Sequence, residues 1–324
     1  MASLLNIPLL ISDEKNGELT RRYYPEVNVQ YWPDFEFRLR EIAEEFDGLV
    51  SCDYWGGEQA LAFRLHTQKA MKFIFCPHGQ SDKGYQSNTL DRYAVQEIVL
   101  LYGSLMKEML IDLSLWESIP KSIVVGNFRR LYYQKNRERL LKVAKDEIFS
   151  KLNPANRTLL YAPTWNDEMQ SGTFFEFGEQ LFKELPSHWN LIIKLHPDIE
   201  QREPVLFHRL SLIEERRENF LVVTDFPLVY PILEMVDVYL GDYSSIGYDF
   251  LSFQKPMFFL QKPHLLQAKL HTCGHVLDRS NPIFPSIEEK ISQDASLQKT
   301  RKRLYEQAFT PVHDFEGVYQ GILQ

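Results

Sequence analysis

Short apolar runs alternate with longer stretches of helical periodicity along the whole chain. Residues 7–11, 49–52, 72–76, 98–102, 123–125, 158–161, 191–195, 220–223, 236–240 and 257–260 form runs that predict strands. Several of these runs are continuously apolar, which is typical of parallel strands covered on both faces. Amphipathic spacing predicts helices over residues 58–66, 137–152, 228–235 and 246–253.

This alternation predicts an α/β protein with doubly wound parallel sheets. So many strands exceed one open sheet of ordinary size, and the polar stretch 127–157 contains no predicted strand. That gap also breaks the even rhythm that a TIM barrel requires. We therefore expect two Rossmann-like domains facing each other across a cleft. The expected domains are residues 1–130 and residues 131–324.

Composition narrows the class of protein. Lys and Arg total 36 and Asp and Glu total 44, so the formal net charge is 36 − 44 = −8, which argues against nucleic acid as a partner. The three cysteines, Cys52, Cys76 and Cys273, form no Cys-x-x-Cys pair and suit a reducing compartment. No apolar run approaches membrane-spanning length, and no secretion signal is recognisable. We expect a cytoplasmic protein.

Polar clusters follow four of the predicted strands, where open parallel sheets bind ligands. After residues 72–76, His78 stands beside Gly79 and is followed by Lys83. An exposed histidine there could transfer a proton, and the lysine could neutralise an anion. The alternative is a Pro/Gly turn with a surface histidine. After residues 158–161, Thr164 could donate a hydrogen bond and Trp165 could stack or pack, or the pair could be a helix cap and a core residue.

The other two clusters follow residues 191–195 and 236–240. His196 precedes a proline that ends its strand, and could bind phosphate or simply cap the strand. Asp242, Ser244 and Ser245 lie at a strand-to-helix junction, where hydroxyls and backbone amides can hold an anion. The alternative is an ordinary serine N-cap. We favour phosphate binding because two serines follow an aspartate.

The sequence lacks the motifs of several well-known classes of enzyme. The sequence has no Asp-x-Asp pair, no Gly-x-Gly-x-x-Gly, no Walker A loop and no Gly-x-Ser-x-Gly elbow. His271 and His275 flank Cys273, but no second cluster completes a closed zinc site. We therefore predict no metal and no cofactor.

Taken in order, the four clusters resemble the CDP-glycerol glycerophosphotransferase family of teichoic-acid and capsule synthesis. His78-Gly79 with Lys83 resembles its His-Gly-x-x-x-Lys motif. The segments 161–165, 194–197 and 225–245 resemble its later motifs, the last ending in Asp-Tyr-Ser-Ser. The resemblance covers about residues 70–320.

The resemblance implies the GT-B architecture, in which residues 1–130 receive the acceptor and residues 131–324 bind the nucleotide donor. It also implies a role for each of several residues. His78 is similar to the catalytic base of the family, with Lys83 beside it in the same motif. The acceptor oxygen would attack the β-phosphorus of a CDP-activated polyol and expel CMP. Donor contacts are implied for Thr164, His196, Asp242, Ser244 and Ser245, and phosphate or acceptor contacts for Arg129 and Lys194. The implied partners are CDP-glycerol or a similar nucleotide-activated donor and a lipid-linked or saccharide acceptor, with peripheral contact to the inner face of the plasma membrane.

Departures from the family pattern keep the substrates open. Asn166 stands where the family often has arginine, and the segment around Arg129 lacks the usual proline and aspartate. CDP-ribitol and nucleotide sugars therefore remain alternative donors. The chain begins directly in its first strand, without the extra N-terminal region of long polymerising members, so we expect single transfer as readily as polymerisation.

Two other functions fit the same fold. One is a nucleotide-sugar glycosyltransferase or a UDP-sugar 2-epimerase, and the other is a protein that binds an activated precursor without turnover. The Asp-Tyr-Ser-Ser and His-Gly-x-x-x-Lys motifs favour the polyol-phosphate transferase.

Overall fold

The computed structural model describes residues 1–52, 56–86, 88–165, 167–196, 199, 202–278 and 280–324. Each of the ten predicted apolar runs overlaps a strand, and every strand pairing is parallel. The strands are β1 (Leu9–Ile11), β2 (Val29–Tyr31), β3 (Gly48–Ser51), β4 (Lys72–Phe75), β5 (Ile98–Leu101), β6 (Lys121–Val124), β7 (Arg157–Tyr161), β8 (Trp189–Ile193), β9 (Phe220–Val222), β10 (Val238–Gly241), β11 (Met257–Phe259) and β12 (His275–Val276). The sequence pattern missed β2 (Val-Gln-Tyr) and β12 (His-Val), because neither lies in a continuous apolar run.

The predicted helices are also present. The helix predicted over residues 58–66 is longer at both ends, and the other three are shorter than expected. The run 137–152 forms a helix that ends at Glu147 and continues as a 3-10 turn, and the run 246–253 divides in the same way after Phe250. The helices are α1 (Ala2–Leu5), α2 (Glu14–Tyr23), α3 (Leu39–Glu45), α4 (Gly56–Thr67), α5 (Ser104–Asp112), α6 (Phe128–Lys135), α7 (Arg137–Glu147), α8 (Phe174–Glu184), α10 (Pro204–Glu214), α11 (Val229–Met235), α12 (Ile246–Phe250), α13 (Ile283–Ile291), α14 (Gln298–Ala308) and α15 (Phe315–Leu323).

The chain divides into two compact units. The first comprises Met1–Gln80, Ser87–Tyr132 and Glu306–Gln324, and the second comprises Ser81–Gln86 and Tyr133–Tyr305. The main division after Tyr132 lies close to the predicted boundary at 130/131. Two segments differ from the prediction: the C-terminal tail belongs to the first unit, and the short segment after His78 belongs to the second.

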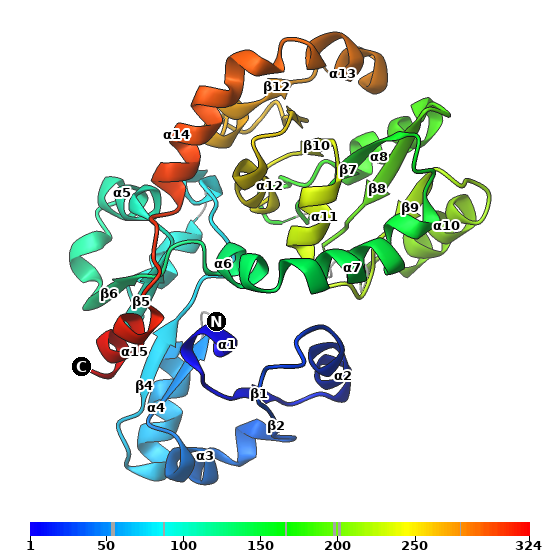
Figure 1. The fold of residues 1–324 in the computed structure, drawn as a ribbon. Helices are drawn as coiled ribbons and strands as arrows, with labels where there is room; N and C mark the ends of the chain where they lie inside the picture. Colours follow the sequence, from blue (N-terminus) through cyan, green and yellow to red (C-terminus); the bar gives the residue numbers. More distant parts are fainter. Residues whose placement is uncertain (53–55, 87, 166, 197–198, 200–201, 279) are drawn as a thin grey trace. The chain divides into compact units, whose positions relative to one another are not determined.

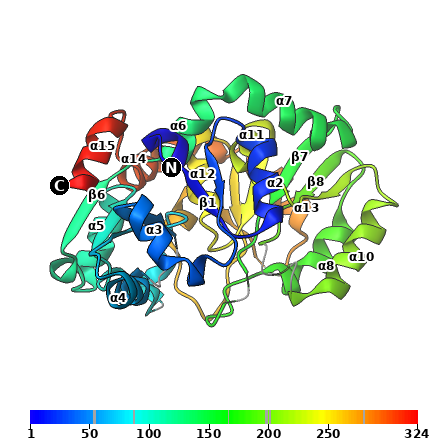
Figure 2. The same ribbon diagram turned by 90° about the horizontal axis from the view of Figure 1, so that it is seen from below.

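The second unit is built on a six-stranded sheet with the order β12-β11-β10-β7-β8-β9. If β7 is counted as the first strand, this is the Rossmann strand order. The order runs outward from β7 to β9 on one side and from β10 to β12 on the other, so it reverses between β7 and β10. Alternate residues of β7 and β8, such as Leu159 and Leu191, enter a core with residues of α8, α10 and α13. Figure 2 shows α7 and α11 on the other side of β7 and β8. Cover on both faces explains why most residues of these strands are apolar.

The first unit contains a four-stranded sheet, β3-β4-β5-β6, and a separate pair, β1-β2. The C-terminal tail returns to this unit because β5 and β6 offer it partners. Thr310 donates its amide to the carbonyl of Tyr102 (3.0 Å), and Gly126 has a φ of +61° with room for no Cβ, which would lie 2.3 Å from the Thr310 carbonyl oxygen. Helix α15 then packs on β6 and α1. These contacts explain why residues 306–324 leave the predicted C-terminal domain.

Candidate functional site at the β7–β10 switch point

The loops after β7 and β10 leave the sheet side by side. These two strands are paired, with Tyr161 opposite Leu240, and the strand order reverses between them. In doubly wound sheets a crevice opens beyond the strand ends at this point and holds the ligand. Thr164 and Asp242 lie in these two loops, as the sequence predicted.

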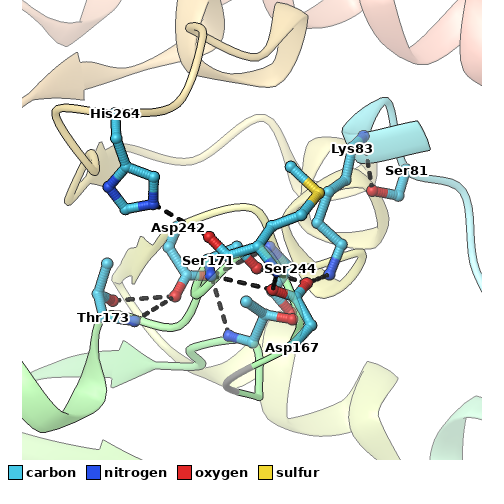
Figure 3. A network of polar contacts seen from close by, with 10 residues as sticks. Ser81, Lys83, Asp167, Ser171, Thr173, Asp242, Ser244 and His264 are labelled. Atoms are coloured by element: carbon cyan, nitrogen blue, oxygen red, sulfur yellow. Dashed lines mark hydrogen bonds and ion pairs between the residues drawn. The ribbon is translucent and has the colours of Figure 1, made fainter. Parts of the chain in front are cut away.

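The carboxylate of Asp242 ties the two loops together (Figure 3). Oδ1 accepts hydrogen bonds from the backbone amides of Thr164 (2.9 Å) and Ser244 (3.1 Å). Oδ2 accepts from the amide (3.1 Å) and the hydroxyl (2.9 Å) of Thr173. Four donors from three segments therefore converge on one side chain.

Asp242 holds the loops after β7 and β10 in place from a buried position. Its side chain has no exposed surface, and burial raises its pKa to about 6, even though Thr164 and Thr173 donate to the carboxylate. The group is ionised at neutral pH and accepts all four hydrogen bonds. In this structure it holds Thr164 and Ser244 in place, whereas the sequence predicted that it contacts the donor.

Ser244 and Ser245 directly precede the first residue of α12, as expected. The hydroxyl of Ser244 accepts a long hydrogen bond from the amide of Ile246 (3.4 Å), and its own amide is bonded to Asp242. Ser245 is the N-cap residue and its side chain caps no amide. Ser244 thus has part of the capping role that was the alternative prediction, while the partly exposed Ser245 stays a candidate for anion contact.

Lys83 lies with the predicted donor residues, in the second unit. Its ammonium forms an ion pair with Asp167 (Nζ to Oδ2, 2.5 Å) in which both side chains are mostly buried. Figure 3 shows this pair close to Ser171, Asp242 and Ser244. The sequence grouped Lys83 with His78 because they share a motif, yet the segment Ser81–Gln86, which carries Lys83, belongs to the second unit.

His196 stands at the end of β8, with its ring 6.2 Å from that of Trp165 and tilted by 30°. The guanidinium of Arg202 lies over the ring of Trp165, 5.4 Å from the ring centroid. The backbone amide of Lys194 continues the sheet by donating to Tyr161 (3.0 Å). The ring of Trp165 therefore contacts both a histidine and an arginine. Arg202 had no recognisable signal in the sequence.

His78 lies in the first unit, in the loop after β4, and is exposed. Arg129 donates from Nη1 to the carbonyl of His78 (2.8 Å), and the hydroxyl of Tyr102 donates to the carbonyl of Pro77 (2.5 Å). The structure thus brings Arg129 to His78, and it fixes the backbone of the loop while leaving the imidazole accessible. Burial raises the pKa of the neighbouring Cys76 thiol to about 11, so Cys76 is protonated and is no nucleophile.

Thr173 lacked a recognisable sequence signal, because it lies twelve residues after the predicted strand 158–161, beyond its cluster. The sequence did single out His271, but only as a possible metal ligand beside Cys273. His271 is buried between the rings of Tyr243 and Phe259, and its Nε2 lies 3.0 Å from the carbonyl oxygen of Asp242. Burial lowers its pKa. Asp167 did have a signal, since it directly follows the Thr164 cluster.

Two positions of the sequence argument lie outside the described residues, namely Asn166 and Pro197. Within the described part of the chain, no group of three or more His, Cys, Asp or Glu side chains is arranged to hold a metal ion. Among the same residues, no helix is long and apolar enough to cross a membrane.

Residues 131–265 match the model of the CDP-glycerol:poly(glycerophosphate) glycerophosphotransferase family. This segment contains the whole β7–β10 switch point. Over this segment the chain is similar to that family. The resemblance drawn from the motifs is thereby confirmed.

Curated relatives extend the match. The teichoic acid poly(glycerol phosphate) polymerase of Staphylococcus epidermidis is 29% identical over 285 residues, which are 75% of this chain and 37% of the relative. The teichoic acid glycerol-phosphate primase of Bacillus subtilis is 30% identical over 130 residues, which are 40% of this chain and 30% of the relative. The matched regions thus cover well under half the length of these relatives.

Solved structures support the fold over nearly the whole chain. The wall teichoic acid polymerase TagF superimposes with a TM-score of 0.63 at 16% identity, covering 97% of this chain and 86% of that one. MnaA of S. aureus, solved with UDP, gives 0.60 at 14% identity, covering 97% and 89%. The chain therefore has an α/β fold of the GT-B class, as predicted.

Proposed function

We propose that this protein transfers glycerol phosphate, or a related polyol phosphate, from a CDP-activated donor to a hydroxyl group of an acceptor. The acceptor oxygen forms a bond to the β-phosphorus of the donor. The bond between that phosphorus and the bridging oxygen breaks, and CMP leaves. The proton of the acceptor hydroxyl passes to a general base.

The observation that supports this proposal is the constellation at the switch point. Lys83, Ser244 and Ser245 gather there around the loops that Asp242 holds. A mostly buried lysine ammonium, together with hydroxyl and amide donors, suits the binding of a diphosphate. This constellation lies largely within the segment that matches the family model, which favours a CDP-linked donor over the nucleotide-sugar alternatives.

Each predicted site residue has a role in this proposal. Thr164, His196, Ser244 and Ser245 contact the donor, and Asp242 positions two of them. Lys83 stabilises the charge that builds on the phosphate oxygens during transfer, because phosphoryl transfer depends mainly on positioning and electrostatic stabilisation. Lys194 contacts a phosphate or the acceptor.

His78 is the proposed base. Its side chain is exposed at a strand end while its backbone is anchored through Arg129, and an imidazole titrates near neutral pH. Arg129 is the proposed cation on the acceptor side. The acceptor is proposed to be lipid-linked or a saccharide, reached at the cytoplasmic face of the membrane by peripheral contact, because the curated relatives are named for teichoic acid synthesis.

Turnover tests the proposal. Purified protein is incubated with CDP-glycerol and membrane vesicles as the source of acceptor, and CMP is quantified by chromatography. We expect CMP release that depends on the vesicles, is abolished in His78→Asn, and is unchanged in His188→Asn, an exposed histidine far along the chain in the second unit. CMP release that survives in His78→Asn would exclude His78 as the base, and no release with any acceptor source would favour a binding protein.

A further inference from the structure

The ion pair between Lys83 and Asp167 is unusual in how its two members are satisfied. Besides Lys83, Asp167 accepts the hydroxyl of Ser171 on Oδ2 (2.7 Å) and the amides of Met169 (3.1 Å) and Ser171 (3.0 Å) on Oδ1. The carboxylate therefore keeps three hydrogen bonds if the ammonium moves away. A lysine ammonium has three donors, of which Asp167 accepts one.

The surroundings of the pair keep both charges. Burial alone would raise the pKa of Asp167, but hydrogen bonds from Lys83 and Ser171 to the carboxylate hold the pKa below its ordinary value. The pair is charged at neutral pH, and about a fifth of the Lys83 side chain is exposed. An entering anion can therefore reach the ammonium without unfolding the loop.

The pair is also placed next to the proposed diphosphate site. Lys83 is close enough to Asp242 to lower the pKa of that carboxyl, and Figure 3 shows the lysine beside Ser244. A move of the ammonium from Asp167 to a phosphate oxygen thus requires only a rotation of the flexible lysine side chain.

We propose that Asp167 is a positioning residue that holds the Lys83 ammonium in reserve, and that the donor diphosphate takes the ammonium from it. This inference rests on the proposed function. While the site is empty, Asp167 keeps the cation ordered. While a diphosphate is bound, Lys83 neutralises it. When CMP leaves, Asp167 competes for Lys83 again and speeds release.

A double-mutant cycle tests the exchange. Wild type, Asp167→Asn, Lys83→Met and the double variant are titrated calorimetrically with CDP, inorganic pyrophosphate and uncharged cytidine. Asparagine can still accept the amides of Met169 and Ser171, so the turn is retained while the competing charge is lost. We expect Asp167→Asn to bind CDP and pyrophosphate about tenfold more tightly, equivalent to about 1.4 kcal/mol. In the Lys83→Met background the same substitution changes affinity by less than about twofold. Cytidine binding stays the same.

A matched control accounts for net charge. Glu179→Gln makes the same charge change in an exposed pair with Lys183 on α8, and we expect it to leave the affinity for both anions unchanged. Tighter binding in this control equal to that in Asp167→Asn would reduce the effect to net charge and overturn the exchange. Weaker or unchanged anion binding in Asp167→Asn, or the same gain without Lys83, would also overturn it.

A second measurement covers the case in which Asp167→Asn fails to fold. In crystals of the wild-type protein soaked with pyrophosphate, we expect Lys83 Nζ to contact the ligand and to leave Asp167. An intact ion pair beside bound pyrophosphate contradicts the inference. If pyrophosphate binds through Lys83 but no cytidine nucleotide binds, the proposed function fails while the exchange stands. If neither ligand binds the wild-type protein, both are overturned.

Discussion

Asp242 Oδ1 accepts the backbone amide of Thr164 at 2.9 Å and thereby joins the loop after β10 to the loop after β7. The two residues are 78 positions apart in the sequence. Because Oδ1 and Oδ2 also accept donors from Ser244 and Thr173, one carboxylate determines the shape of the crevice on both sides of the switch point.

Removing this carboxylate should weaken both the fold and the donor site. Asp242→Ala leaves the amides of Thr164, Thr173 and Ser244 without their acceptor, and each unsatisfied buried donor costs about 1 kcal/mol or more. We expect the free energy of unfolding to fall by about 3 kcal/mol, and CDP affinity to fall at temperatures where the variant is folded. Urea denaturation followed by circular dichroism measures the first effect.

Asp278→Ala is the matched control, because Asp278 is an exposed aspartate of the same unit whose carboxylate accepts from the nearby Ser280. Its free energy of unfolding should change by less than about 0.5 kcal/mol. Equal losses in the two variants would mean that the Asp242 hydrogen bonds carry no special weight.

The raised pKa of Asp242 predicts a pH dependence of stability. Burial raises this pKa to about 6 from the ordinary value of 3.8, so between these values the folded protein binds more protons at this site than the unfolded chain does. The contribution of Asp242 is therefore fully present below about pH 4 and is lost as the pH rises to about 6. A shift of about two units corresponds to about 3 kcal/mol.

Urea denaturation of wild type and Asp242→Asn at intervals from pH 4 to 7 isolates this contribution, because other titrating groups cancel in the difference. We expect the free energy of unfolding of wild type, relative to the variant, to decrease by about 3 kcal/mol across that range. A difference that stays constant with pH would show that the Asp242 pKa is not raised.

Tyr102 should affect turnover without affecting donor binding. Its hydroxyl holds the Pro77 carbonyl beside His78 in the first unit, while the donor residues belong to the second. We expect Tyr102→Phe to lower kcat about tenfold, which corresponds to about 1.4 kcal/mol from one lost hydrogen bond, and to leave the Kd for CDP unchanged. Tyr31→Phe, an exposed tyrosine of the first unit, is the control. A weaker CDP affinity in Tyr102→Phe with unchanged kcat would contradict the assignment of His78.

The strands and the switch point could be predicted because their signal is local. Residues 158–161 and 236–240 are mainly apolar, with Thr158 and Asp237 as exceptions, and the polar residues that follow them mark the carboxyl ends of β7 and β10. Asp242 could be singled out in the same way. Its role as an acceptor for Thr164 and Thr173 could not, because that role depends on which strands become neighbours.

The ion-pair partner of Lys83 could not be predicted from the sequence for the same reason. Lys83 and His78 are five residues apart and share a motif, which suggested a common task. The chain between them passes from the first unit to the second, and the lysine then meets Asp167, 84 positions away. The C-terminal tail was misassigned because nothing in residues 306–324 indicates that Thr310 pairs with Tyr102.

The most direct test of the central claim is calorimetric titration of the purified protein with CDP-glycerol, CMP, UDP-GlcNAc and UMP, repeated on Ser244→Ala and His196→Ala. We predict selective binding of the cytidine ligands that is weakened in both variants. Selective binding of the uridine ligands would contradict the polyol-phosphate assignment while leaving the fold intact.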